Sequence, residues 1–125
     1  MGGADFRQPV PLRSGTVPVA PYIDAAYFEA ERDKIFRRCW LNLAREEELP
    51  QPGDYLVKDL EVLDTQVLLV RGEDRRIRAF HNLCVHRGNR LALDRCGQAR
   101  GFSCNFHGWT YDTTGRLREL PDRDQ

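Results

Sequence analysis

The sequence lacks three features that would direct a protein to a nucleic acid or a membrane. Its 19 Lys and Arg residues balance its 19 Asp and Glu residues, so the formal net charge is zero and no overall field attracts an anionic partner. No run of about 18 apolar residues occurs. The first thirty residues also lack the basic start and apolar run of a secretory signal. We therefore expect a cytoplasmic protein that binds neither nucleic acid nor membrane.

Cysteine and histidine are also scarce, with four Cys and three His residues. In a reducing cytoplasm these cysteines are expected to be thiols rather than disulfides. Cys84 and Cys104 each lie close in sequence to a histidine, whereas Cys39 and Cys96 do not. We interpret Cys39 and Cys96 as ordinary thiols and the two Cys–His pairs as candidate metal ligands.

The N-terminal part of the chain differs in composition from the rest. A length of 125 residues predicts one domain. Residues 1–21 hold four of the seven prolines, which predicts an extended arm before a domain over residues 22–125. Asp24 is a suitable N-cap for a helix over about residues 24–38. Three aromatic side chains near this helix are expected in the core: Phe28, Phe36 and Trp40.

Beyond residue 40 the pattern is mainly β. Residues 40–43 predict a strand, and residues 50–54 predict a turn. Residues 66–70 and 76–80 flank a Gly-containing turn, which predicts a hairpin whose second strand leads directly to Cys84. We predict a small antiparallel sheet with both Cys–His segments at its tips and Cys96 in the loop between them.

Two short segments carry the metal-binding chemistry. They read Cys-Val-His-Arg-Gly at residues 84–88 and Cys-Asn-Phe-His-Gly-Trp at residues 104–109. Thiolate and imidazole are ligands for zinc or for an iron–sulfur cluster, whereas calcium and magnesium prefer oxygen. Each segment supplies one ligand of each kind, so both cysteines can bind one metal and both histidines another. That division is found in a Rieske [2Fe–2S] centre.

These segments and their surroundings resemble the Rieske domain of the large (alpha) subunit of bacterial aromatic ring-hydroxylating oxygenases. The resemblance covers roughly residues 22–118 and includes residues 27–40, Gly53-Asp-Tyr, Arg78-Ala-Phe-His-Asn and Gly101-Phe-Ser-Cys. It implies a small antiparallel Rieske-type sheet sandwich with the cluster held between two loops. An N-terminal arm and one helix are expected to precede it.

The resemblance also implies a role for each residue of the two segments. Cys84 and Cys104 are expected to bind one iron through sulfur, and His86 and His107 the other through a ring nitrogen. The cofactor would be a Rieske-type [2Fe–2S] cluster. Four further residues are expected to surround this cluster: Arg87, Gly88, Gly108 and Trp109.

The Rieske proteins of the respiratory cytochrome complexes carry an extra cysteine in each cluster loop and join them by a disulfide, whereas this chain has Asn89 and Phe106 at those positions. They also have a hydroxyl-bearing residue where this chain has Trp109. Fewer hydrogen bonds to the sulfurs predict a reduction potential near the low end of the Rieske range, roughly −150 mV.

The implied function is transfer of one electron from a ferredoxin or reductase to a mononuclear Fe(II). In the family that iron is bound by two histidines and a carboxylate. Once His86 and His107 are assigned to the cluster, only His81 remains. We therefore expect the chain to be part of a dioxygenase without being catalytically complete, with its partner an oxygenase catalytic domain or subunit. The catalytic domain would be missing from a fragment, an excised domain or a truncated gene product.

Two other functions are compatible with the ligands. The first is a free-standing Rieske ferredoxin, but a leader of about fifty residues with a helix and Trp40 is unusual for such a carrier. The second is a structural module in which zinc bound by two cysteines and two histidines stabilises the fold. A zinc module leaves the residues shared with the oxygenase family unexplained.

Overall fold

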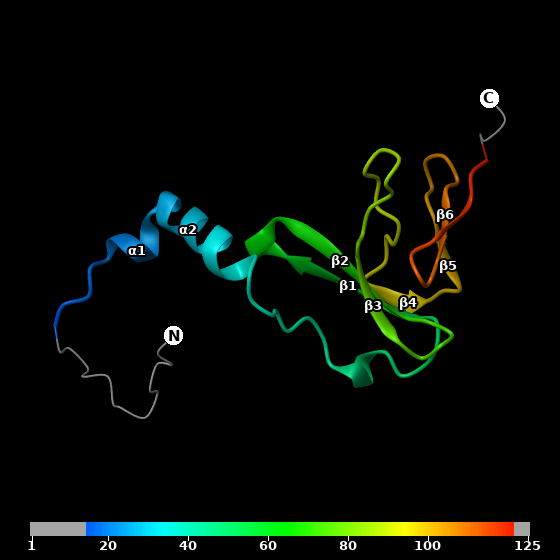
Figure 1. Cartoon of the computed structure of the whole chain (residues 1–125), viewed down its shortest axis with the longest axis horizontal. Coiled ribbons are helices and arrows are strands. Elements are labelled where there is room, and N and C mark those ends of the chain that lie inside the picture. The colour runs from blue at the N-terminus through cyan, green and yellow to red at the C-terminus, as the bar shows by residue number, and fades with distance from the viewer. Residues whose placement is uncertain (1–14, 122–125) are drawn as a thin grey trace, which may run out of the picture.

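The computed structural model describes residues 15–121, so most of the predicted arm over residues 1–21 lies outside the described residues. The described chain contains two antiparallel β-sheets preceded by a helical segment (Figure 1). This arrangement confirms the prediction of a mainly β fold with antiparallel sheets. The two Cys–His segments belong to different sheets, however, and not to the tips of one sheet.

The first sheet has four strands in the order β3-β2-β1-β4. Their bounds are Asp54–Leu60 for β1, Thr65–Arg71 for β2, Ile77–His81 for β3 and Cys96–Gln98 for β4. Strand β4 pairs with β1, so Cys96 lies in a strand and not in a loop as predicted. The hairpin predicted over residues 66–80 is present as β2 and β3, which pair from Val67–His81 to Arg71–Ile77.

The second sheet has three strands in the order β5-β6-β7. Their bounds are Gly101–Ser103, Thr110–Asp112 and Leu117–Glu119. Phe102 of β5 packs with Leu68 and Val70 of β2 in a buried cluster. This cluster joins the two sheets, and burying each large apolar side chain in it stabilises the fold by roughly 1.5–3 kcal/mol.

Strand β2 is buried on both faces. Leu68 and Val70 face the cluster shared with the second sheet, whereas Val67 and Leu69 pack with Leu49 of the preceding segment. A strand covered on both sides is expected to be a continuous apolar run, and Val-Leu-Leu-Val is such a run. Short 3₁₀ helices at Glu46–Glu48 and Glu61–Leu63 flank β1 on either side.

A buried arginine attaches the segment before β1 to the first sheet. Arg71, at the end of β2, has a side chain only 8% exposed. Its guanidinium donates to the carbonyl oxygen of Leu49, to the carbonyl of Arg75 at 2.8 Å and to the carboxylate of Glu46 at 3.0 Å. These bonds satisfy a cation that would be costly to bury alone.

The helical segment consists of α1 (Ala20–Ile23), α2 (Ala25–Glu31) and a π-helical turn at Arg32–Phe36. Asp24 caps α2 by accepting a hydrogen bond from the Ala26 N–H at 2.8 Å. The regular α-helix is therefore shorter than the helix predicted over residues 24–38. Residues 40–43, predicted as a strand, have no regular secondary structure. None of the helices described within residues 15–121 is long and apolar enough to cross a membrane.

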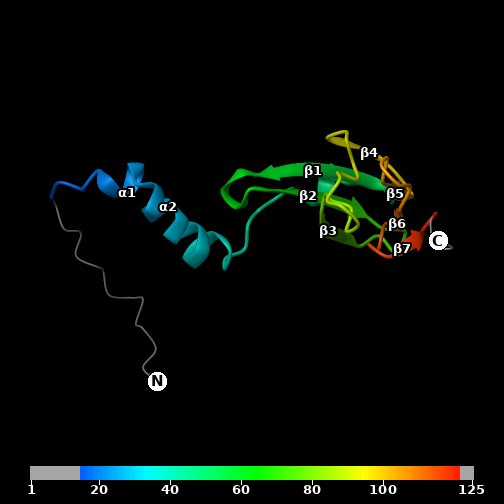
Figure 2. The same ribbon diagram turned by 90° about the horizontal axis from the view of Figure 1, so that it is seen from above.

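The aromatic side chains of this segment are not in the core. The segment extends away from both sheets (Figure 2), and none of residues 20–36, all of them described, is fully buried. Trp40 is fully exposed and Phe28 is 40% exposed, so their prediction as core residues was wrong. Phe36 is half-buried. The physical reason is that no sheet lies against this segment to cover its apolar side chains.

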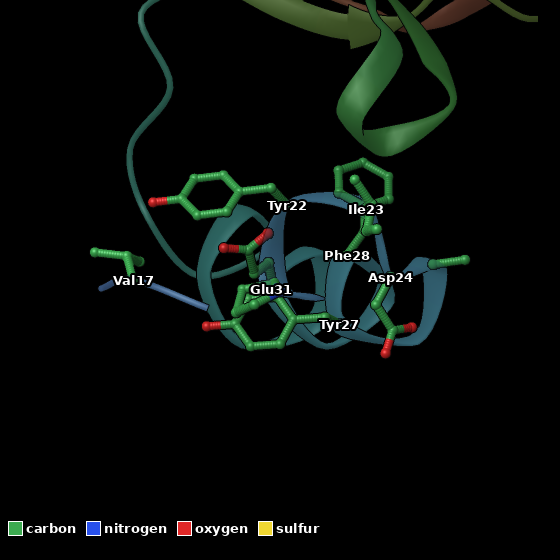
Figure 3. A pocket seen from close by; sticks show the side chains of 9 residues that line it. Val17, Tyr22, Ile23, Asp24, Tyr27, Phe28 and Glu31 are labelled. Carbon is green, nitrogen blue, oxygen red and sulfur yellow. The ribbon is translucent and has the colours of Figure 1, made fainter. Parts of the chain in front are cut away.

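Figure 3 shows a hollow on the helical segment, surrounded by Tyr22, Ile23, Tyr27 and Phe28 together with the carboxylates of Asp24 and Glu31. Its volume is about 610 Å³. None of the residues that line it belongs to a Cys–His segment. The hollow is therefore separate from the candidate metal centre.

Candidate metal centre

The two Cys–His segments fold into loops with the same backbone hydrogen bonds. In the first loop, residues 84–89, the N–H of Cys84 donates to the carbonyl of Asn89 at 2.7 Å and the N–H of Gly88 donates back to Cys84 at 2.8 Å. In the second loop, residues 104–109, the N–H of Cys104 donates to Trp109 at 2.8 Å and the N–H of Gly108 donates to Cys104 at 2.9 Å. The equivalent positions are thus Cys84 and Cys104, and Asn89 and Trp109.

Both loops turn at a glycine in the left-handed conformation. The φ angle is +70° at Gly88 and +71° at Gly108. A side chain at these positions would strain the backbone, which explains why each histidine is followed closely by glycine. The loops project in the same direction next to each other (Figure 1), although they come from different sheets.

The first loop is held at its base by a buried amide. Asn82 follows β3 directly, and its side chain exchanges two hydrogen bonds with the backbone of Ala92, at 2.8 and 2.9 Å. The second loop needs no such support because it joins two paired strands, β5 and β6. Asn82 was not identified from the sequence, because its partner Ala92 lies ten residues away in a stretch without a recognisable secondary-structure pattern.

The two cysteine sulfurs lie together in the interior. Cys84 is 1% exposed and Cys104 is 3% exposed, and both pack against Tyr111 of β6. The Tyr111 hydroxyl lies 3.3 Å from Cys84 Sγ and accepts from the Val85 N–H at 3.2 Å. Burial, reinforced by the Cys84 thiol, raises the pKa of Tyr111 to about 12, so the hydroxyl keeps the proton that it can donate.

Cys104 has its own set of donors. Burial raises the pKa of the Cys104 thiol, but hydrogen bonds from the backbone N–H groups of Phe106 and His107 and from the side chains of Cys84 and Asn89 lower it by more. The net pKa is below the usual value, because these donors stabilise the thiolate. A thiolate is the form of cysteine that binds metal.

The two imidazole rings form the second pair. The ring centroids of His86 and His107 are 4.7 Å apart. Trp109 stacks on His86 with a centroid distance of 4.7 Å and an interplanar angle of 8°. His86 is exposed, whereas His107 is half-buried. Its Nδ1 atom is buried and has no hydrogen-bond partner among residues 15–121.

The structure therefore arranges the four predicted ligands as a pair of sulfurs and a pair of rings. Within residues 15–121, no three His, Cys, Asp or Glu side chains converge as the ligands of one metal ion would. The donor set fits a two-iron cluster, with thiolates for one iron and imidazoles for the other. His81 is outside this group, since its Nδ1 lies 3.1 Å from Thr65 Oγ1.

The four predicted surrounding residues differ in what they contact. Gly88 and Gly108 form the turns, and Trp109 covers one face of His86. Arg87 is exposed in the first loop. The contacts of Tyr111 and Asn89 with the sulfurs were missed in the sequence. No sequence pattern pointed to Tyr111, whereas Asn89 was identified only as the residue at the position of an extra cysteine in other Rieske proteins.

Comparison with known proteins agrees with this geometry. Residues 39–125 match the Rieske [2Fe-2S] domain. The alpha subunit of biphenyl 2,3-dioxygenase from Rhodococcus jostii (strain RHA1) is 37% identical over 122 residues, which are 98% of this chain and 26% of the relative. The alpha subunit of chlorobenzene dioxygenase from Cupriavidus sp. (strain PS12) is 38% identical over 87% of this chain and 24% of the relative. The chain thus spans about a quarter of the length of the curated relatives that it matches.

Solved structures show the same fold. Naphthalene 1,2-dioxygenase from Rhodococcus sp. bound to indole superposes with a TM-score of 0.79 and 38% identity, over 85% of this chain and 24% of that one. The quaternary ammonium Rieske monooxygenase CntA superposes with a TM-score of 0.80 and 34% identity, over 87% of this chain and 30% of that one. With its matched loops, its paired candidate ligands and these relatives, the chain belongs to the Rieske [2Fe–2S] domain family.

Proposed function

We propose that this chain transfers single electrons through a Rieske [2Fe–2S] cluster, with Cys84 and Cys104 bound to one iron and His86 and His107 to the other. Such a cluster, when bound, takes up one electron and releases it again. The observation that carries the proposal is His107 Nδ1, a buried ring nitrogen without a partner among residues 15–121. An unpaired buried polar atom costs about 1–3 kcal/mol, and a bond to metal at that atom removes the cost.

The surrounding residues have distinct roles in this proposal. Tyr111 and Asn89 donate hydrogen bonds to the sulfurs and stabilise the negative charge there. Trp109 shields one face of the His86 ring. The exposed part of His86 faces solvent, where an electron-transfer partner can approach.

We further propose that the chain acts as the Rieske component of an aromatic ring-hydroxylating oxygenase. Residues 22–125 would form this component, preceded by the arm. Relatives are named alpha subunits of biphenyl and benzene dioxygenases, or the large oxygenase component of a naphthalene 1,2-dioxygenase system. The electron would come from a ferredoxin or reductase. It would pass to a mononuclear iron bound by residues outside this sequence, since His81 is the one histidine left over.

Two observations weigh against the alternatives. A zinc module needs four ligands around one ion, whereas here the sulfurs and the rings form separate pairs. A free-standing carrier would leave Tyr22, Ile23 and Trp40 exposed to water without benefit, whereas a larger assembly can cover such side chains.

The proposal is tested on the purified chain by assaying iron, sulfide and zinc, and by recording visible absorption and EPR spectra before and after dithionite. We expect about two irons per chain, a reddish-brown colour and a Rieske-type EPR signal after reduction. A colourless protein with one bound zinc would contradict the proposal and support the structural module.

A further inference from the structure

The two loops that carry the ligands come from different sheets, so their separation must be held by contacts between them. Loop residues at the end of β3 and loop residues between β5 and β6 share no strand pairing. Tyr111 supplies one connection, because its hydroxyl contacts both Cys84 Sγ and the Val85 N–H. Asn89 supplies a second connection on the side of the other sulfur.

Asn89 is bonded to both cysteines at once. Its backbone carbonyl accepts the Cys84 N–H at 2.7 Å. Its side-chain Nδ2 donates to Asn105 Oδ1 at 2.6 Å and lies 3.8 Å from Cys104 Sγ. Asn89 is half-buried, while Asn105 is exposed. One residue of the first loop thus contacts the backbone of one sulfur ligand and the sulfur of the other.

The equivalent position of the second loop is used differently. Trp109 accepts the Cys104 N–H with its carbonyl, just as Asn89 accepts the Cys84 N–H. Its side chain stacks on His86 instead of reaching a sulfur. The same backbone position therefore contacts a sulfur in one loop and a ring in the other.

We propose that Asn89 is a positioning residue that clamps the two loops together and fixes the spacing of the two sulfurs. The clamp is non-covalent: a hydrogen bond from Asn89 Nδ2 to Asn105 Oδ1 connects the loops. The same nitrogen lies 3.8 Å from Cys104 Sγ and 3.4 Å from the carbonyl oxygen of Arg90. This inference rests on the proposed function, because the spacing matters only when both sulfurs bind one iron. Residues that support metal ligands in this way typically change metal affinity by about 10–100-fold.

The test compares four variants of the iron-loaded chain. Asn89→Leu keeps the approximate size and removes every side-chain hydrogen bond of Asn89, whereas Asn105→Ala removes only the hydrogen bond between the two amide side chains. The third variant combines the two changes. The control is Ser103→Ala, which deletes an exposed hydrogen bond of 2.8 Å to Thr110 next to Cys104 but within one pair of strands. Loss of visible absorbance in excess chelator gives the rate of iron release, and a redox titration gives the midpoint potential.

We expect Asn89→Leu to release iron at least about tenfold faster than the wild type, and Asn105→Ala to release it several-fold faster. The double variant should be no faster than Asn89→Leu, because both changes remove the same bond. The midpoint potential should fall in Asn89→Leu, where the donor to Cys104 is lost, and stay at the wild-type value in Asn105→Ala. If Asn89 had a purely structural role, the midpoint potentials of Asn89→Leu and Asn105→Ala would both equal the wild-type value.

Several results would overturn the clamp. The first is iron release at the wild-type rate in both Asn89→Leu and Asn105→Ala. The second is iron release from Ser103→Ala that is accelerated as much as the release from Asn89→Leu. If Asn89→Leu does not assemble a cluster, the exposed Asn105→Ala change decides alone: wild-type release overturns the clamp, and faster release supports it. A wild-type chain without iron would instead overturn the proposed function, and the clamp with it.

Discussion

The first and second loops close with the same pair of backbone hydrogen bonds, yet their histidines have different surroundings. His86 is the third residue of its loop; Trp109 stacks on its ring, and the residue is otherwise exposed. His107 is the fourth residue of its loop and is half-buried with an unpaired Nδ1. The two rings thus lie at different positions of the same backbone turn and differ in their exposure to solvent. The comparison suggests that the loops are two halves of one centre with unequal access to a partner.

The largest effect should come from removing either sulfur. If the loops are halves of one centre, Cys84→Ser and Cys104→Ser should each lose both irons, because neither loop binds a metal alone. Iron assays and visible spectra of the purified variants measure this. Cys96→Ser is the matched control, since Cys96 is exposed in β4 and should leave about two irons bound. A Cys84→Ser or Cys104→Ser variant that kept one iron would contradict the interpretation that the two loops are halves of one centre.

The two turn glycines should differ in how well they tolerate a methyl group. Both have left-handed φ angles, so Gly88→Ala and Gly108→Ala should each lose about 1 kcal/mol of unfolding free energy. A Cβ at Gly88 would meet no atom within 4 Å, whereas at Gly108 it would lie 3.0 Å from Pro121 Cγ. We therefore expect the larger loss in Gly108→Ala. Urea unfolding of both variants measures the difference, and a larger loss in Gly88→Ala would contradict it.

A smaller effect is expected from the hydroxyl that contacts Cys84. Tyr111→Phe removes a hydrogen-bond donor worth about 0.5–1.5 kcal/mol, so the midpoint potential should fall by tens of millivolts. A redox titration of the iron-loaded chain measures the shift. Tyr55→Phe is the control, because Tyr55 packs against Phe102 in the core away from the sulfurs. An unchanged potential in Tyr111→Phe would show that this contact does not stabilise the reduced centre.

The smallest effect concerns the turn after β6, which has no counterpart beside the first loop. Burial raises the pKa of Asp112, but hydrogen bonds from Thr114, Arg116 and Arg118 lower it by more, to about 2. A depressed carboxyl pKa stabilises the fold above the unfolded value of 3.8, and this contribution is lost as the pH falls towards 2. Asp112→Asn should therefore unfold at a lower temperature than the wild type at pH 6, with the difference shrinking at pH 2.5. If the difference in unfolding temperature between the wild type and Asp112→Asn did not depend on pH, the charge of Asp112 would be excluded as its cause.

Local features of the chain were predictable from the sequence. The hairpin of β2 and β3 depends on alternating and apolar residues around a short turn, and it appears where expected. The candidate ligands stood out because each loop contains its cysteine and histidine within four residues. Trp40 and Phe28 were assigned to the core because aromatic residues are usually buried, but no sheet covers their segment.

The sequence by itself determined the kind of chemistry, because thiolate, imidazole and glycine at short spacing are local properties of the chain. Only the tertiary structure decided which distant groups meet. The contacts of Tyr111 with Cys84 and of Asn89 with Asn105 join residues 27 and 16 positions apart. They exist because the core cluster of Leu68, Val70 and Phe102 packs the two sheets together and brings both loops to the same side. No local pattern encodes such an arrangement, since it depends on how the sheets pack.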